Sequence, residues 1–343
     1  MKAGIVRAWG GPEAVRIEEV PDPVPGPGQV LVRLRAAGLN RADVIIREGG
    51  FPEAPCPIIL GVEGAGEVAD PGDRAYGLEA GQKVLLSPMI VCGACAACRA
   101  GADNACPSLK VIGEHMDGTY AQYIAVPRHN VLPAPANLGH VELAAAMTAY
   151  MTAWHMLATR AAVAEGETVL IAGAGSGVGS AAVQVAKLLG ARVIATTGTP
   201  DKERRLREIG ADEVIDYRRT PEFHEAVRDL TGGRGADVAH DSVGRATFQR
   251  SILALRHGGR LVCMGSHTGA RVELDLWNIY RREITILGAH TAGARDIAEF
   301  LPHLAGGALR PLVDSVFPLE RAADAQARLV SSERFGKVVL TID

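Results

Sequence analysis

The sequence predicts a two-domain α/β protein, in which a compact β-rich unit is followed by a parallel sheet covered by helices. Three observations support this prediction. The 343 residues exceed what one hydrophobic core usually holds together. Residues 1–130 contain short apolar runs separated by proline and glycine turns. Beyond them, strand-like and helix-like segments alternate regularly, which is typical of a parallel sheet.

Short apolar runs define the β-rich unit. Residues 29–35 alternate apolar and polar side chains with a period of two, and 64–68 and 82–86 are short and mostly apolar. The proline-rich stretch 21–27 predicts a turn between strands. We expect a barrel-like unit, to which the chain returns from about Leu301 before it ends in a strand at 336–341.

An alanine-rich helical segment at 141–157 leads into the second unit. The expected strands of its parallel sheet are 168–172, 192–196, 213–216, 238–241, 260–264 and 285–288. Helices such as 178–189 and 202–209 lie between them. We therefore expect one domain at 1–128 and 290–343, and the other at 129–289.

The composition excludes several classes of function. Hydrophobic residues make up 48% and charged residues 22%, and no uninterrupted apolar run is long enough to span a bilayer. The net charge of −3, with dispersed basic residues, provides no patch for nucleic acid. We therefore expect a soluble, cytoplasmic protein with a small-molecule substrate and neither a membrane nor a nucleic-acid partner.

Four cysteines have the spacing of a metal site. They are Cys92, Cys95, Cys98 and Cys106. Four thiolates fill a tetrahedral zinc site and leave no open position for water or substrate, so such a zinc is structural. Two disulfides are the alternative, but the chain is long, has only two further cysteines and begins without an apolar signal segment. We expect one structural zinc per chain in a lobe at 92–106.

A glycine-rich turn follows the first strand of the second unit. It contains Gly173, Gly175, Ser176, Gly177 and Val178 and opens a helix. Glycines let the backbone approach a pyrophosphate, and the helix N-terminus offers it free N–H groups. An ordinary strand-to-helix turn is the alternative, but the strand and helix alternation that follows favours a dinucleotide site.

The end of the second strand bears on which dinucleotide is bound. A site selective for NAD normally has a carboxylate there to hold the ribose 2′-hydroxyl, and Thr197 occupies that position. A 2′-phosphate then meets no repulsion, and Thr197, Thr199 and Lys202 can bind it. NADP(H) is favoured over NAD(H), although nearby Asp201 leaves NAD(H) open.

Further segments occur in a fixed order along the chain. They are Pro25-Gly-Pro-Gly-Gln-Val-Leu-Val32, Ala36-Ala-Gly-Leu-Asn-Arg-Ala-Asp43, Gly61-Val-Glu-Gly-Ala-Gly-Glu-Val68, Asp117-Gly-Thr-Tyr-Ala-Gln-Tyr123, Leu189-Gly-Ala191, Gly210-Ala-Asp212 and Asp241-Ser-Val-Gly244. With the cysteine lobe and the glycine-rich turn, they resemble the medium-chain dehydrogenase/reductase superfamily over almost the whole length. The resemblance implies a GroES-like β-barrel catalytic domain, a Rossmann domain with a doubly wound parallel sheet, and a homodimer or homotetramer.

The resemblance also implies contacts with the cofactor. Arg41 is expected at the pyrophosphate or ribose, Val178 under the adenosine and Tyr217 near the adenine. Ser242, Val243 and Gly265 are expected along the nicotinamide half. Packing at strand ends is the alternative for each of these residues.

The chain departs from its zinc-dependent relatives at the catalytic metal. Asn40, Val62 and Thr148 occupy the positions where those relatives have zinc ligands, and none of the three is a usual zinc donor. We therefore expect no usual catalytic zinc, although an unanticipated set such as Asp43, Glu63 and His115 stays open. The pair Asn40 and Asp43 looks like the quinone-reductase branch.

Without a Lewis acid, a conjugated carbonyl is the better substrate, because hydrogen-bond donors can stabilise the enolate that hydride addition forms. Asn40 is the candidate donor, with Thr148 and Thr152 beside the nicotinamide. Tyr150 and His155 are candidate proton donors. The alternative for Asn40 is a turn residue that binds its own backbone.

Three functions are compatible with these features. The favoured one is an NADP(H)-dependent reductase of quinones, enones or related carbonyls with one structural zinc. The second is an NAD(P)-dependent alcohol dehydrogenase with an atypical catalytic metal site. The third is a non-enzymatic, redox-responsive zinc protein that binds NADPH.

Overall fold

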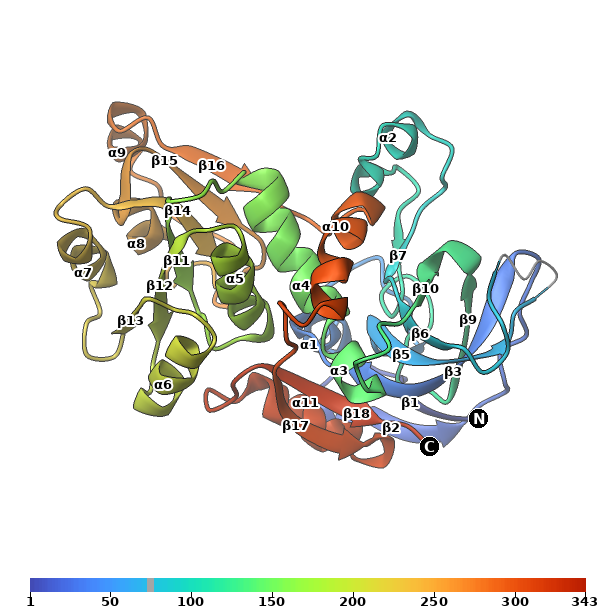
Figure 1. The fold of residues 1–343 in the computed structure, drawn as a ribbon. Helices are drawn as coiled ribbons and strands as arrows, with labels where there is room; N and C mark the ends of the chain where they lie inside the picture. Colours follow the sequence, from blue (N-terminus) through green and yellow to red (C-terminus); the bar gives the residue numbers. More distant parts are fainter. Residues whose placement is uncertain (73–76) are drawn as a thin grey trace. The chain divides into compact units, whose positions relative to one another are not determined.

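The computed structural model describes residues 1–72 and 77–343 and divides the chain into two compact units (Figure 1). The terminal unit contains Met1–Thr148 and Arg310–Asp343, and the central unit contains Ala149–Leu309. The sequence places this division at 128/129 and 289/290. Residues 131–144 belong to the terminal unit because strand β10 (Val131–Pro133) pairs with its sheet and helix α3 (His140–Ala144) packs on its strands.

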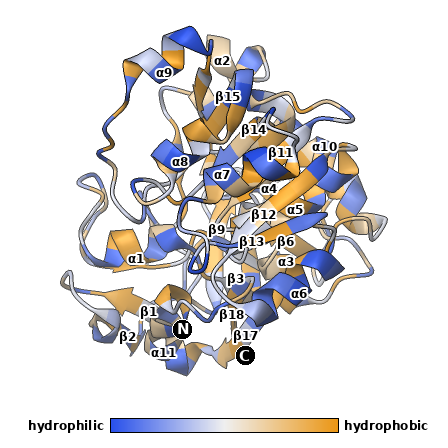
Figure 2. Ribbon diagram, turned by 90° about the vertical axis from the view of Figure 1, so that its left-hand side faces the viewer, coloured by the Kyte–Doolittle hydropathy of each residue, from blue (hydrophilic) through white to orange (hydrophobic). Residues whose placement is uncertain are grey.

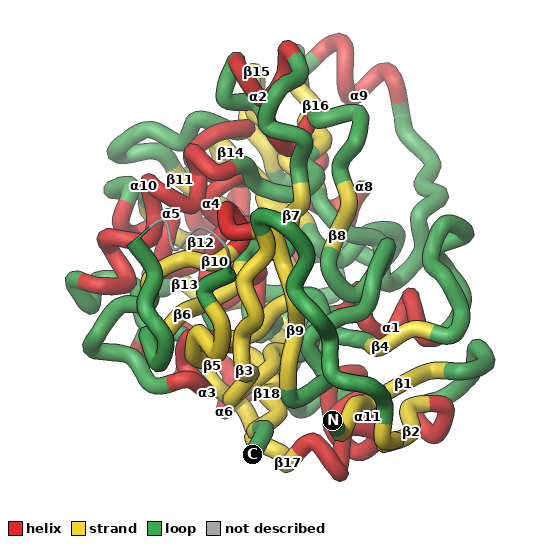
Figure 3. Tube along the Cα trace, turned by 90° about the vertical axis from the view of Figure 1, so that its right-hand side faces the viewer, coloured by secondary structure: helices red, strands yellow, loops and turns green. Residues whose placement is uncertain are grey.

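A seven-stranded sheet is the main layer of the terminal unit. Its strand order is β10-β6-β5-β3-β18-β17, with β9 paired to β3. The strands are β3 (Gln29–Gly38), β5 (Glu63–Asp70), β6 (Lys83–Leu86), β9 (Tyr123–Pro127), β17 (Val313–Pro318) and β18 (Lys337–Thr341), with β10 at the edge. Figure 3 shows β3, β5, β6 and β9 side by side. The alternating pattern of β3 buries Val30, Val32 and Leu34, as the sequence predicts.

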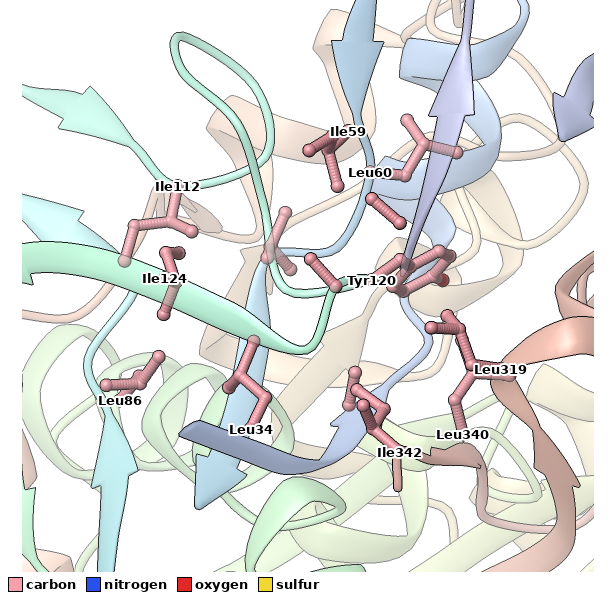
Figure 4. Close-up of a cluster of buried hydrophobic side chains, with 14 of the residues drawn as sticks. Leu34, Ile59, Leu60, Leu86, Ile112, Tyr120, Ile124, Leu319, Leu340 and Ile342 are labelled. Carbon is pink, nitrogen blue, oxygen red and sulfur yellow. The ribbon is translucent and has the colours of Figure 1, made fainter. Parts of the chain in front are cut away.

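The rest of the terminal unit closes its core. A smaller sheet has the order β2-β1-β4, and two helices contribute apolar faces. These elements are β1 (Lys2–Val6), β2 (Val15–Glu19), β4 (Ile58–Ile59), α1 (Arg41–Arg47) and α11 (Ala322–Val330). Figure 4 shows Leu34, Leu60, Tyr120 and Leu340 in one cluster, so both ends of the chain contribute to the same core.

A lobe extends from the terminal unit between β7 (Met89–Ile90) and β8 (Lys110–Val111) (Figure 1). It carries the short helix α2 (Ala96–Arg99) and all four clustered cysteines. Apart from the β7–β8 pair, its regular structure is limited to α2 and one 3-10 turn (Asp103–Ala105).

The central unit has the predicted parallel sheet. Its order is β13-β12-β11-β14-β15-β16, which is the doubly wound arrangement. The strands are β11 (Thr168–Ala172), β12 (Arg192–Thr197), β13 (Glu213–Asp216), β14 (Ala236–Asp241), β15 (Leu255–Cys263) and β16 (Thr285–Gly288). The strand order reverses between β11 and β14, and ligands of such sheets bind at that point, beside the carboxyl ends of the strands.

Helices pack on the strands of this sheet: α5 (Gly177–Leu188), α6 (Pro200–Glu208), α7 (Phe223–Leu230) and α8 (Phe248–Leu253). The further helices are α4 (Met147–Trp154), which begins at the end of the terminal unit, α9 (Leu276–Arg281) and α10 (Ala294–Ala305). Figure 2 shows the hydrophilic helix α6 beside the hydrophobic strand β12, and Leu206 is the buried residue of α6. No helix among the described residues is long and apolar enough to cross a membrane.

Candidate functional site

The cysteine lobe brings its four sulfurs together. All four lie within 4.8 Å of one another. Sγ–Sγ distances of 3.5 Å from Cys95 to Cys98 and 3.6 Å from Cys106 to Cys92 are close to the roughly 3.8 Å separation that a tetrahedral zinc site requires. Cys106 is buried, whereas Cys92 is exposed. The residues present therefore fit a four-sulfur zinc site.

The backbone of the lobe supports this arrangement. The N–H groups of Cys92, Cys95 and Cys98 each donate to a sulfur of the quartet, at 3.4–3.5 Å. Donation from Ala94 and Cys95 lowers the pKa of Cys92 to about 6. Burial and neighbouring thiols raise the pKa of Cys98 to about 12. Four adjacent thiolates repel one another, so a bound cation is what lets all of them ionise.

A second polar cluster lies inside the terminal unit, around Glu63. Strand pairing places Gly38 opposite Glu63 and Val339 opposite Gly38, which brings the first residue of β18, Lys337, beside Asn40. The Lys337 ammonium donates to Leu39 O and Asn40 Oδ1, each at 2.7 Å, and to Glu63 Oε1. Glu63 is fully buried and Lys337 is 4% exposed. We call Asn40, Glu63 and Lys337 the Glu63 cluster.

Glu63 also reaches the helix that joins the two units. Its Oε2 accepts the Thr148 N–H at 2.7 Å, and its Oε1 accepts the Asn40 side-chain amide at 2.8 Å. A Cβ on Gly38 would lie 2.7 Å from Glu63 Oε1 and 2.0 Å from Ala144 O, so only glycine fits there. The expected helix at 141–157 is interrupted between α3 and α4, because Thr148 donates to Glu63.

Asp43 forms a buried network next to this cluster. Its Oδ2 accepts the Asn40 N–H at 2.7 Å and the Tyr120 hydroxyl at 3.0 Å, while its Oδ1 has no partner. Tyr120 accepts from Gln326, whose amide oxygen accepts from Arg47. Burial raises the pKa of Asp43 to about 7. Asp43 therefore fixes the start of α1, and with it Asn40.

The three residues predicted at the metal positions offer no usual zinc donor. Val62 is buried in the apolar core, Asn40 is bonded to Lys337 and Glu63, and Thr148 offers only a hydroxyl. The alternative set of Asp43, Glu63 and His115 is not brought together, because the cysteine quartet is the one metal-ligand cluster among the described residues.

Two hydroxyls on α4 lack partners. The Oγ1 atoms of Thr148 and Thr152 are buried without a hydrogen bond, although helical threonines commonly bond to the preceding turn. Spaced four residues apart, they lie on one face of α4. The two candidate proton donors are packed inside the central unit: Tyr150 stacks on Phe300 with centroids 6.4 Å apart, and His155 Nδ1 lies 2.9 Å from Asp296 Oδ2.

The glycine-rich turn has the close approaches that its sequence predicts. A Cβ on Gly179 would lie 2.4 Å from Gly173 O, and one on Gly173 would lie 2.7 Å from the Val243 side chain. The Ser176 hydroxyl caps α5 by accepting the Gly179 N–H at 2.9 Å. Gly175 and Gly177 flank this cap, and Val178 follows in the first turn. The turn therefore fits a phosphate cradle.

Asp241 shapes the neighbouring strand end, a role that the sequence analysis did not assign. Its Oδ1 accepts the N–H groups of Val243 and Gly244, and its Oδ2 accepts two hydroxyls. Thr268 bonds to Val243 O, and a Cβ on Gly265 would lie 3.1 Å from Ser242 O. The predicted residues Ser242, Val243 and Gly265 thus lie together beyond β14 and β15.

A further basic residue that the sequence analysis missed, Arg218, follows β13 and lies beside Gly198 at the tip of β12. A Cβ on Gly198 would lie 2.6 Å from the Tyr217 hydroxyl and 3.1 Å from Arg218 Nε. Among the described residues, none forms a hydrogen bond or ion pair with the Arg218 guanidinium, and the buried Thr197 Oγ1 also lacks a partner. Thr199 caps α6 at Lys202 N. The signal in the sequence is the Tyr217-Arg-Arg run at the end of β13.

Arg41 begins α1 in the terminal unit. It is exposed, and its guanidinium has no hydrogen-bond or ion-pair partner among the described residues. It is therefore available to an anion, as the prediction of a phosphate contact requires.

Two family models match the chain. The alcohol dehydrogenase GroES-like domain matches residues 26–136, and the zinc-binding dehydrogenase domain matches residues 177–306. They cover, respectively, the part of the terminal unit with the cysteine lobe and most of the central unit.

Individual proteins and solved structures match the chain over nearly its whole length. The chain is 32% identical to an acryloyl-coenzyme A reductase of Metallosphaera sedula over 343 residues, covering 99% of this chain and 100% of that protein. It is 28% identical to human quinone oxidoreductase, covering 100% and 98%. A solved structure described as an NAD-dependent alcohol dehydrogenase matches with a TM-score of 0.96 and 42% identity, covering 100% of both chains.

Proposed function

Since the chain belongs to the medium-chain dehydrogenase/reductase superfamily and is an NAD(P)-dependent oxidoreductase, we propose that it is an NADP(H)-preferring reductase of quinones, enones or related conjugated carbonyls. Its proposed metal is a structural zinc at Cys92, Cys95, Cys98 and Cys106, without a usual catalytic zinc. The proposal rests on the residues next to Glu63. By the family resemblance, Asn40, Val62 and Thr148 occupy the positions of the metal ligands of zinc-dependent relatives, and none of them is a usual zinc donor.

The reaction follows from what these side chains can stabilise. When bound, the nicotinamide cofactor supplies or accepts the hydride. Asn40 is the donor to the substrate oxygen: its amide has a long contact of 3.3 Å to Gly38 O, which an enolate oxygen can replace. Asp43 holds the Asn40 backbone, and the unpartnered hydroxyls of Thr148 and Thr152 offer hydrogen bonds to the carboxamide of the nicotinamide.

The tip of β12 supports the preference for NADP(H). Thr197 leaves no carboxylate there to repel a 2′-phosphate, and the Arg218 guanidinium and the Tyr217 hydroxyl both lie against Gly198. An unpaired guanidinium is the side chain best suited to a phosphate. Lys202 adds positive charge within the same unit, and Arg41 of the terminal unit stays a predicted phosphate contact.

We propose a homodimer or homotetramer, in keeping with the family resemblance. Helix α9 exposes Leu276, Trp277 and Tyr280, which are 57–68% exposed, and Ile286 lies on the edge strand β16. Exposed aromatic side chains beside an open strand edge favour association. Light scattering that gives 36.0 kDa, the mass of one chain, contradicts this expectation. The cytoplasm stays the expected location.

An alcohol dehydrogenase is the second candidate, because the 42% identical solved structure is described as NAD-dependent and as acting on alcohols. The acryloyl-coenzyme A reductase and the quinone oxidoreductase instead favour conjugated substrates. This second function requires oxygen stabilisation from a metal site that the Glu63 cluster does not offer.

A substrate panel separates the two candidates. The purified protein is given NADPH or NADH with a quinone, an enone and an enoyl thioester, and the oxidised cofactors with primary and secondary alcohols. We expect reduction of the conjugated carbonyls and a higher kcat/KM with NADPH. Turnover of alcohols alone, with a second tightly bound metal, contradicts the proposal.

A further inference from the structure

Glu63 and Lys337 form an unusual pair. No other lysine or arginine ion pair in the described part of the chain has both side chains buried. Transfer of two charges out of water is costly unless every remaining donor and acceptor is satisfied. The pair meets this condition, because the three ammonium protons have three acceptors and both Glu63 oxygens accept hydrogen bonds.

The pair joins four segments of the terminal unit. Glu63 begins β5, Lys337 begins β18, Asn40 precedes α1, and Thr148 is the second residue of α4. Through its two oxygens, the Glu63 carboxylate therefore connects the residue before α1 directly to the start of α4.

The pair also fixes which way the Asn40 amide points. An ammonium accepts no hydrogen bond, so Lys337 selects the Asn40 oxygen; a carboxylate donates none, so Glu63 selects the nitrogen. A flipped amide would face two repulsive contacts. Lys337 itself has no proton left for a substrate, so it acts through Asn40 as a positioning residue.

We propose that the Glu63–Lys337 pair is a positioning device for the reaction, because it holds the Asn40 amide and the start of α4 in the geometry that hydride transfer needs. This inference rests on the proposed function, because Asn40 is the donor in that reaction. It extends the proposed function by assigning the two residues on which that donor depends.

The test removes both charges together, so that neither is left buried alone. The variants are E63Q/K337M, the conservative K337R, and the control R35M/E67Q, which removes a half-buried ion pair between β3 and β5 in the same sheet. We expect E63Q/K337M to lower kcat at least tenfold with KM and NADPH affinity within twofold, K337R to retain part of the rate, and the control to keep it. An unchanged kcat in E63Q/K337M, or an equal loss in the control, overturns the proposal.

Hydrogen exchange gives a readout that needs no substrate. In E63Q/K337M the amides of residues 38–43 and 147–152 should exchange faster than in the native protein, and in R35M/E67Q they should not. Unchanged exchange there overturns the positioning role even if no substrate is found. If the native protein reduces no conjugated carbonyl, the proposed function fails separately. If E63Q/K337M does not fold, E63Q alone must show the same local exchange, or the proposal fails.

Discussion

The terminal unit contains two polar clusters that differ in the source of their positive charge. In the cysteine lobe, four sulfurs lie within 4.8 Å of one another, an arrangement that fits a metal cation supplied from outside the chain. In the Glu63 cluster, a carboxylate, an amide oxygen and a backbone carbonyl gather around an ammonium that the chain itself provides. The first arrangement is open to a metal, and the second is already complete.

This difference separates two roles that zinc often combines in one family. Soft thiolates select zinc strongly, and four of them leave no room for a substrate. The Glu63 cluster has no thiolate or imidazole, and its cation is a lysine. Under the proposed function, zinc therefore stabilises the lobe, and the reaction depends on the cofactor and on hydrogen bonds.

The largest effect is expected at the cysteine quartet. Cys106→Ser should reduce zinc from one ion per chain to much less and lower the free energy of unfolding by roughly 3–5 kcal/mol, because bound metal contributes directly to folding. Metal analysis and denaturant unfolding measure both changes. Cys56→Ser is the control, since Cys56 is exposed and outside the quartet. Full stability of Cys106→Ser without zinc would show that the lobe needs no metal.

The stability of the protein should be nearly as sensitive to substitution in the Glu63 cluster. Lys337→Met leaves Glu63 as an unpaired buried charge, and we expect a loss of about 3–5 kcal/mol in the free energy of unfolding. Arg35→Met, which breaks the half-buried pair with Glu67, should cost no more than about 1 kcal/mol. Equal losses in the two variants, measured by urea unfolding at neutral pH, would mean that burial does not distinguish them.

The sequence predicts the cysteine quartet far better than the Glu63 cluster. The cysteine spacing and the glycine-rich turn are local patterns, so their outlines, like the six parallel strands, follow from short segments. Lys337 lies 274 residues from Glu63 along the chain, and the local sequence indicates only that it begins an apolar strand. Its partner is set by the register of β18 on β3 and of β3 on β5. Arg218 is missed for the same reason, because its position beside Gly198 depends on the pairing of β12 with β13.

Asp43, next to the Glu63 cluster, should make the free energy of unfolding depend on pH. Its pKa is raised from 3.8 to about 7 in the folded chain, so the proton that it holds stabilises the fold fully below pH 4 and this contribution is lost as the pH rises through 7. Asp43→Asn removes the titration. Between pH 4 and 7 the native protein should lose up to about 1.4 kcal/mol per pH unit relative to this variant. Parallel stability curves for the two proteins contradict a neutral Asp43.

The smallest effect is expected near the tip of β12, where the Arg218 guanidinium has no hydrogen-bond or ion-pair partner among the described residues. Arg218→Ala should weaken NADPH binding about tenfold and leave NADH binding unchanged, because one charge-assisted contact with the 2′-phosphate is lost. Fluorescence titration with both cofactors measures this difference. Arg219→Ala is the matched control, since Arg219 pairs with Asp216. Equal weakening for both cofactors would place Arg218 elsewhere on the cofactor.

The central claim is that the chain binds metal at the cysteines alone and runs its hydride chemistry without a second ion. The most direct measurement is the number of zinc ions per chain in the active protein, determined by mass spectrometry of metals on the same sample whose carbonyl reduction is assayed before and after brief exposure to a chelator. We predict one zinc per chain and an unchanged initial rate. Two tightly bound ions, with activity that disappears as the second is removed, would contradict the account.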